Sequence, residues 1–216
     1  MVNPDLAGGA LLDLGIYSLT WVFQTLYSLQ PHPRAPSVLA MMRKYKLGTD
    51  EQTTMLLDFP RDCGSAHAIA TTGMRTASDP SGRGEVGPAV RVQGERGEIQ
   101  VWPPIYRPTR TRLIRSGDGD GGDAEVQDRQ WPQPGPGAGS GFYNGFAGAW
   151  NAEGEGHGMF WEADECARAL REGRKESAVQ PLTESLAIMR VMDEVRRQGD
   201  MKLPDKIETT EYPVEL

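Results

Sequence analysis

The amino-terminal segment is a long run in which apolar residues occupy nearly every helical face. Asn3 followed by Pro4 is typical of a helix cap and first turn, and Pro31 marks an end. A helix that is apolar all round is usually buried. Serine, threonine and glutamine interrupt the run, which makes it too polar for a good membrane span or signal peptide. We therefore predict a buried helix that begins near Pro4 or Leu6, and we expect no membrane partner.

Between residue 37 and about residue 131 the pattern changes to short β-rich runs separated by turn residues. The short connections favour a mainly antiparallel sheet. Residues 117 to about 148, rich in glycine, proline and carboxylates, are expected to form one long mobile excursion. The predicted strands are Ser37–Tyr45, Gln52–Phe59, Cys63–Thr72, Ala89–Val92, Glu98–Trp102, Arg110–Arg115 and Val126–Trp131.

Two helical patterns follow. Met159–Arg171 carries one apolar stripe and stops at Gly173, while Pro181–Gln198 ends on two arginines that suit the helix dipole. The tail from Lys202 is expected to be extended. The order helix, sheet, helix, helix predicts an α+β fold with a mainly antiparallel, open-faced sheet and helices packed on one face. We interpret all 216 residues as one domain.

Composition narrows the possible partners. The chain has 23 basic and 30 acidic residues, for a net charge of -7, which makes nucleic-acid binding a poor hypothesis. Two cysteines, Cys63 and Cys166, are too few for a disulfide scaffold. We expect both to be buried, reduced thiols in a cytoplasmic protein. His32, His67 and His157 lack the spacing of metal ligands, so no metal site is predicted.

The first candidate site lies within the apolar amino-terminal run. Asp13 would be a costly buried charge unless it is paired or faces a cavity, and Tyr17 follows one helical turn later on the same face. A carboxylate and a phenol placed in this way could grip one substrate hydroxyl. Gly9, one turn earlier, would leave space beside them. From the residues alone, the structural alternative comes first: Tyr17 as a core tyrosine with its hydroxyl satisfied, and Asp13 as a helix residue with a local partner.

Two further residues are candidate substrate ligands. His157 stands between two glycines at the entry to a helix, after a glycine-rich loop that could border a cleft; a turn or capping role is the alternative. Phe160, with Trp161 and two aromatic residues before it, could line a sugar-stacking surface, or could simply pack. The expected substrate-binding residues are therefore Gly9, His157 and Phe160.

The run Asp5-Leu-Ala-Gly-Gly-Ala-Leu-Leu-Asp13-Leu-Gly-Ile-Tyr17-Ser-Leu-Thr-Trp21 resembles the helix that opens the carboxy-terminal domain of the glucose–fructose oxidoreductase / inositol dehydrogenase (Gfo/Idh/MocA) superfamily. Tyrosine stands where inositol dehydrogenases have histidine. This makes the sequence most similar to the dimeric dihydrodiol dehydrogenases and the fungal NADP-dependent D-xylose dehydrogenases. Segments 156–164, 171–173 and 193–197 resemble the last two helices of that branch.

The resemblance implies a chemistry. Tyr17 would be the general acid/base on a substrate hydroxyl while hydride passes between that carbon and NADP, and Asp13 would hold the same hydroxyl. The substrate would be an aldopyranose, oxidised to a lactone, or a trans-dihydrodiol. A phenol titrates near pH 10 in model compounds, so a tyrosine base needs a nearby cation. In the family a lysine of a Glu-Lys-Pro motif in the amino-terminal domain lies at the site, and this sequence contains no such motif.

The family's Rossmann domain precedes this helix, and the nearest dinucleotide-binding pattern here, Gly119 to Ala124, lies among carboxylates with no helix behind it. We expect the chain to be a carboxy-terminal fragment, or the product of a gene model that starts at an internal methionine. The cofactor-binding residues are therefore unknown.

The family also suggests a homodimer through the open face of the sheet. Depending on register, that face could be supplied by Val38, Ala40, Met42, Met55, Leu57 and Ile69. Two alternatives stay open. The chain could be a stand-alone, non-catalytic sugar-binding or dimerisation module, which should not bind NADPH, or a fragment that folds poorly and aggregates.

Overall fold

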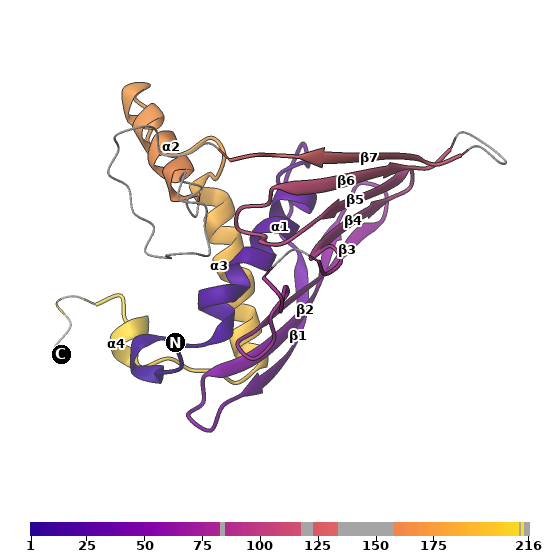
Figure 1. The fold of residues 1–216 in the computed structure, drawn as a ribbon. Coiled ribbons are helices and arrows are strands. Elements are labelled where there is room, and N and C mark those ends of the chain that lie inside the picture. The colour runs from indigo at the N-terminus through magenta and orange to yellow at the C-terminus, as the bar shows by residue number, and fades with distance from the viewer. Residues whose placement is uncertain (83–84, 118–122, 134–157, 212, 214–216) are drawn as a thin grey trace. The chain divides into compact units, whose positions relative to one another are not determined.

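A computed structural model describes residues 1–82, 85–117, 123–133, 158–211 and 213. It divides into two compact units, the first formed by residues 1–77 and 179–216 and the second by residues 78–178. Helices and antiparallel sheets make up both units (Figure 1), which confirms the α+β class. The described strands form two sheets, of three and four strands, where the sequence pattern had suggested one.

The sheet of the first unit has the antiparallel order β1-β2-β3, with β1 at Ser37–Lys44, β2 at Asp50–Pro60 and β3 at Ser65–Gly73. Alternate residues of β2 are buried, because successive side chains of a strand point to opposite faces. The buried face is covered by helices. The opposite face is exposed.

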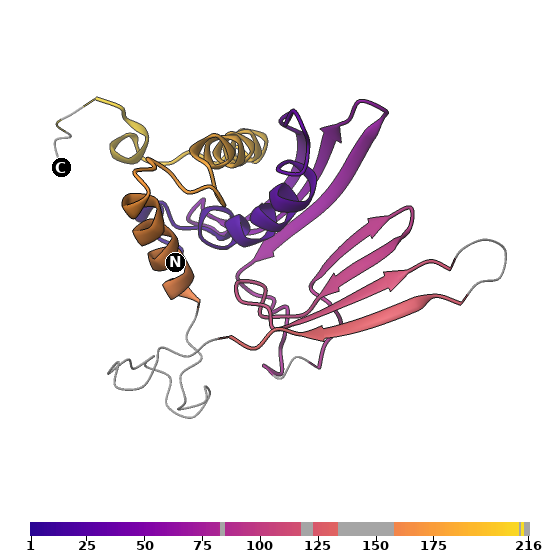
Figure 2. The ribbon, with the colours of Figure 1, turned by 90° about the horizontal axis from the view of Figure 1, so that it is seen from above.

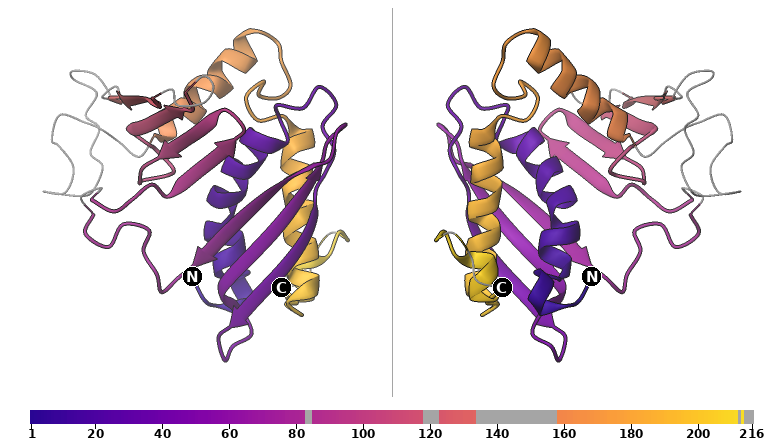
Figure 3. Two further views of the ribbon diagram at one scale, coloured as in Figure 1. Left: turned by 90° about the vertical axis from the view of Figure 1, so that its right-hand side faces the viewer. Right: turned by 90° about the vertical axis from the view of Figure 1, so that its left-hand side faces the viewer.

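Helices α1 (Ile16–Leu26) and α3 (Leu182–Gln198) lie side by side on the buried face of this sheet (Figure 3). The ring of Phe23 meets that of Phe59 edge to face, with centroids 5.6 Å apart. Burial of such large apolar side chains is the main source of stability for the unit. The core consists of Leu11, Leu19, Phe23, Val38, Met55, Leu57, Phe59, Ala70, Ala187, Ile188, Val191, Met192 and Val195.

The register corrects the predicted dimer face. Five of the six residues proposed for it point toward the helices: Val38, Ala40, Met42, Met55 and Leu57. The open face instead carries Leu39, Met41, Leu56 and Ile69. Alternation requires that odd and even positions lie on opposite faces, but it does not say which face the helices cover.

The amino-terminal helix is also different from the prediction. It consists of a 3-10 turn (η1, Pro4–Leu6), a π-helical turn (η2, Leu11–Gly15) and α1. The stretch Pro4–Leu26 is long and apolar enough to cross a membrane, with a mean hydropathy of 1.4 in its most apolar window, but its core-facing side chains pack on the sheet. Only 33% of that window is buried, so the expectation of a helix buried on every side was wrong.

The outer edge of β1 is closed by a side chain of α3. Gln198 donates from Nε2 to the carbonyl oxygen of Val38 at 2.8 Å, and its Oε1 accepts the N–H of Ala40 at 2.7 Å. The amide thus occupies the backbone groups that a further strand would use. A strand edge protected in this way is less open to the addition of a further strand.

The second unit contains a four-stranded antiparallel sheet of β4 (Val90–Gly94), β5 (Gly97–Val101), β6 (Arg110–Arg115) and β7 (Glu125–Gln130), in that order (Figure 2). Strand β7 confirms the strand predicted at Val126–Trp131, and its pairing with β6 interrupts the single excursion expected over residues 117–148. Residues 118–122 and 134–148 of that segment lie outside the described residues.

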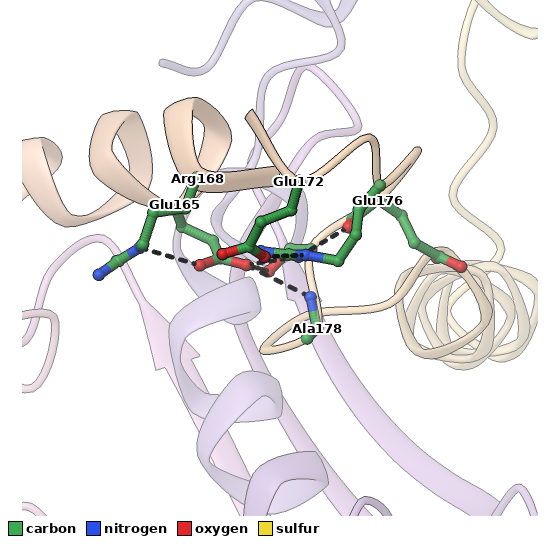
Figure 4. Close-up of polar contacts among 7 residues, drawn as sticks. Glu165, Arg168, Glu172, Glu176 and Ala178 are labelled. Atoms are coloured by element: carbon green, nitrogen blue, oxygen red, sulfur yellow. Dashed lines mark hydrogen bonds and ion pairs between the residues drawn. The ribbon is translucent and has the colours of Figure 1, made fainter. Parts of the chain in front are cut away.

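Helix α2 (Met159–Arg171) has the predicted bounds and is tied to the loop that follows it. Oε1 of Glu165 accepts hydrogen bonds from Arg174 Nη1 at 3.0 Å, Ser177 Oγ at 3.1 Å and the N–H of Ala178 at 3.3 Å (Figure 4). The hydrogen bond from Arg174, followed by that from Ser177, lowers the pKa of the Glu165 carboxyl. The tail predicted to be extended contains a short helix, α4, at Asp205–Glu208.

Both cysteines are exposed, which corrects the expectation of buried thiols. Cys63 lies in the turn between β2 and β3, and Cys166 lies on α2. Neither forms a disulfide. The cytoplasmic location stays a prediction.

Candidate active site

Asp13 and Tyr17 lie on the exposed side of the amino-terminal helix, one in η2 and the other in the first turn of α1. Tyr17 is 43% exposed to solvent. The opposite side, with Leu11, Gly15 and Leu19, is buried against the sheet. The helix therefore presents a carboxylate and a phenol to the same side of the unit, as their spacing predicted.

Asp13 is exposed, so the reason for proposing it from the sequence was wrong. Asp13 had been expected to be buried, and so to need a partner or a cavity. In the structure its carboxylate lies at the surface of the first unit, where water compensates its charge. Its position one turn before Tyr17, and not burial, is what makes it a candidate.

The turn that holds Asp13 is π-helical, a form that is rare and found frequently at functional sites. Nothing in the local sequence indicated it. Gly15 closes this turn and is buried, and a Cβ placed there would contact Leu11 Cδ1 at 3.3 Å and Thr72 Cγ2 at 3.5 Å. The glycine lets the wide turn approach strand β3 closely.

Two hydroxyls of the helix and of β3 fasten these elements together. Thr72 donates from Oγ1 to the carbonyl oxygen of Ala10 at 3.1 Å, and Ser18 donates from Oγ to the carbonyl oxygen of Thr71 at 2.7 Å. One bond lies just before η2 and the other just after Tyr17. The segment that carries both candidate residues is therefore held to the sheet at each end.

Asp50, at the start of β2, is a functional candidate that the sequence analysis missed. Its residue is 0% exposed, and its Oδ2 accepts the N–H of Leu11 at 2.8 Å and the hydroxyl of Thr53 at 2.9 Å. Burial raises the pKa of the Asp50 carboxyl, and the hydrogen bonds oppose this rise. Asp50 is 39 residues from Leu11, so no local pattern could have linked them.

Gly9 lies against this carboxylate and has a φ of 140°. A Cβ at Gly9 would stand 2.3 Å from Oδ1 of Asp50. The space that had been expected beside Asp13 is thus filled by the protein's own carboxylate, which explains the glycine without a ligand. A substrate-binding role for Gly9 stays a prediction.

The remaining candidates are not brought to this helix within the first unit. Phe160 belongs to α2 in the second unit, where it is half-buried and its ring lies 4.9 Å from that of Trp161. His157 lies outside the described residues, as do Phe146 and Trp150, the two aromatic residues expected to line a surface with Phe160, and most of the Gly119–Ala124 pattern. Within the first unit, the structure places Asp13 and Tyr17 on one exposed side of the helix, whereas Gly9 is buried against Asp50.

Within the described residues, neither a metal-binding cluster nor the parallel strand arrangement of a Rossmann dinucleotide site is present. None of their histidine, cysteine and carboxylate side chains cluster in a group that could hold a metal ion. Every strand pairing among them is antiparallel. In a Rossmann domain, a dinucleotide binds at the carboxyl ends of parallel strands, where a glycine-rich turn opens a helix. The described part of the chain therefore does not fit NADP in that manner.

Comparison with known proteins gives several matches, although no protein-family model matches the chain. The chain is 48% identical over 214 residues to D-xylose 1-dehydrogenase (NADP(+)) of Hypocrea jecorina. The match covers 98% of this chain and 49% of that protein. The chain is 29% identical over 198 residues to trans-1,2-dihydrobenzene-1,2-diol dehydrogenase of Bos taurus, and 28% identical over 198 residues to that of Macaca fascicularis, with 92% of this chain and 48% of each relative covered. The chain thus spans about half the length of these relatives.

A solved structure shares the fold. A protein described as an oxidoreductase, yvaA of Bacillus subtilis, matches 90% of this chain and 50% of its own, with a TM-score of 0.50 and 13% sequence identity. At that identity the likeness concerns the arrangement of helices and strands alone.

Proposed function

We propose that this chain is the substrate-binding part, the carboxy-terminal domain, of an NADP-dependent dehydrogenase that oxidises a CH–OH group of a sugar or a diol. The observation that carries the proposal is the 48% identity to an NADP-dependent D-xylose 1-dehydrogenase along 98% of the chain. The exposed pair of Asp13 and Tyr17, on a helix fastened to the sheet, supports it.

The residues of this chain handle the proton. The Tyr17 oxygen accepts the proton of the substrate hydroxyl as that carbon is oxidised, and returns it in the reverse direction. The Asp13 carboxylate, which only accepts hydrogen bonds when ionised, takes one from the same or the adjacent hydroxyl and so orients the ring. NADP, when bound, supplies the acceptor for the hydride.

The cofactor site is proposed to lie in a segment other than the one described. This agrees with the antiparallel pairing of the described strands and with relatives of about twice the length. The rival hypothesis is a non-catalytic sugar-binding or dimerisation module. Under that hypothesis, the native protein needs no cofactor-binding segment.

The proposal is tested by following reduced nicotinamide with D-xylose, a trans-dihydrodiol and no substrate. The assay uses this chain and, in parallel, the product of the complete transcript. We expect the isolated chain to leave NADPH fluorescence unchanged, and the complete product to reduce NADP with one of the two substrates. A complete product that binds NADPH but oxidises neither substrate would contradict the proposed function. Turnover by the isolated chain would contradict only the separate cofactor segment.

We further propose that a second copy of the chain covers the open face of the first sheet. Leu39, Leu56 and Ile69 are paired across the three strands and form one apolar row, and Met41 lies beside it. Leu39 and Ile69 are 69% and 73% exposed. A contiguous apolar row on an exposed sheet face marks an interaction site, and a face of this kind can pack on its own copy about a two-fold axis.

We expect Ile69→Asp to convert a dimer into a monomer in sedimentation velocity, because the interface would bury an unpaired carboxylate in the apolar row. Leu47→Asp is the matched control, since Leu47 is 64% exposed in the turn between β1 and β2. A wild-type chain that sediments as a monomer at micromolar concentration, or an Ile69→Asp variant that remains dimeric, would contradict this assignment.

A further inference from the structure

The helix that carries Asp13 and Tyr17 begins without a cap of its own. The first N–H groups of any helix lack partners inside it and are usually satisfied by a serine, threonine, asparagine or aspartate just before it. Here the preceding residues are Gly9 and Ala10, and Ala10 makes no side-chain cap bond. The N–H of Leu11 is satisfied by Oδ2 of Asp50, from another element of the fold.

Capping the helix with the carboxylate of Asp50 costs free energy, because the carboxylate is buried. Asp50 is 0% exposed, and its Oδ1 is a buried oxygen with no hydrogen-bond partner among the described residues. Burying a carboxylate costs free energy that its hydrogen bonds offset only in part, since burial still raises its pKa, and a serine or asparagine beside the helix would provide the same bond at lower cost. Stability alone therefore does not explain why an aspartate caps this helix. The fixed position of its carboxylate does, because the carboxylate is also bonded to Thr53, which is itself 0% exposed.

The anchor lies at the start of the turn that carries Asp13. A π-helical turn holds one residue more than an α-helical turn. Because residues four apart lie on one side of a helix, Asp13 and Tyr17 share a side, but the place of the Asp13 carboxylate on that side depends on where the turn begins. Fixing the N–H of Leu11 on the sheet holds the start of the turn and so keeps the Asp13 carboxylate at a fixed place relative to Tyr17.

We propose that Asp50 is a positioning residue for the reaction: its buried carboxylate holds the start of the π-helical turn and thereby sets Asp13 against Tyr17. This inference rests on the proposed function. Asp50 does not touch the substrate, and it acts only through the backbone of the helix.

The test compares Asp50→Ala and Asp50→Asn with Val195→Ala, a core substitution in α3 of a residue that is also 0% exposed. It is made in the protein in which turnover is measured. We expect Asp50→Ala to lower kcat at least tenfold with the KM for NADP unchanged. Asp50→Asn should restore most of kcat, because the amide oxygen still accepts the N–H of Leu11. Val195→Ala should lower the Tm and leave kcat near wild type below that temperature.

Hydrogen–deuterium exchange gives a second measurement that needs no turnover. Asp50→Ala should speed exchange of the amides of residues 11–17 and leave those of β2 protected, whereas Val195→Ala should speed both. Unchanged exchange at residues 11–17 overturns the anchor. Faster exchange there with wild-type kcat, or an equal loss of kcat in Val195→Ala, overturns the positioning role.

The two failures remain distinguishable. A wild-type protein with no turnover on sugar or diol refutes the proposed function, and the exchange pattern then decides the anchor by itself. Should Asp50→Ala not fold, Thr53→Val replaces it, because it removes a bond to the same carboxylate oxygen with little change in shape. The same selective exchange at residues 11–17 is then expected, and its absence overturns the anchor.

Discussion

Replacing Tyr17 with phenylalanine is expected to lower turnover on a sugar or diol by about 10²–10⁴-fold, the usual contribution of a general acid/base. The ring remains, so packing on α1 is kept, and only the hydroxyl that exchanges a proton with the substrate is lost. The KM for NADP should not change, because the proposed role of Tyr17 concerns the substrate hydroxyl. The measurement is the steady-state rate of NADP reduction with D-xylose and with a trans-dihydrodiol.

Tyr45→Phe is the matched control for this prediction. Tyr45 lies in the first unit, just after β1, and its backbone N–H bonds to Thr49, which the substitution leaves intact. It should keep the wild-type rate. A Tyr17→Phe variant within twofold of wild type, in a protein that does turn over, would remove Tyr17 from the mechanism and leave Asp13 as the remaining candidate on this helix.

Replacing Gly9 with alanine is expected to destabilise the first unit by roughly 3 kcal/mol or more, from two causes. The backbone at a φ of 140° is one that residues with a Cβ rarely adopt, and holding one there costs on the order of 1–3 kcal/mol. The new Cβ would also stand 2.3 Å from the Asp50 carboxylate, and moving that group breaks buried hydrogen bonds worth about 1–3 kcal/mol. Urea denaturation, followed by circular dichroism, measures the loss.

Gly48→Ala separates the two causes. Gly48 also has a positive φ, of 92°, but a Cβ there would meet no atom within 4 Å. It should cost only the backbone strain, and so clearly less than Gly9→Ala. Equal losses in the two variants would show that the contact between Gly9 and Asp50 contributes nothing to stability.

The sequence was sufficient for elements whose cause is local. Arg110–Arg115 and Met159–Arg171 were predicted with the bounds that the structure has, since alternation, a helical stripe and a stop at Gly173 are written into neighbouring residues. The four-residue spacing of Asp13 and Tyr17 likewise placed them on one side of the helix. The likeness of this segment to a dehydrogenase helix is carried by the order of its residues alone.

Other features depended on which surfaces meet, and these were predicted wrongly or missed. The period of two in β1 and β2 separates two faces, but only packing of α1 and α3 decided that Val38 and Leu57 are buried and that Leu39 and Leu56 are not. In the same way, Asp13 had been expected to be buried because its neighbours in sequence are apolar. The sheet covers only one side of its helix.

The hydrogen bond from Leu11 to Asp50, which anchors the candidate site, also depends on which surfaces meet. The sequence by itself determined most of the strands, the helices Met159–Arg171 and Leu182–Gln198 and the Asp13–Tyr17 spacing, because these follow from residues within one or two turns of each other. Only the tertiary structure decided that Asp50 approaches Gly9, caps Leu11 and leaves Asp13 and Tyr17 exposed. Those contacts join residues far apart in the chain, and their energies arise only once the sheet and the helix have come together.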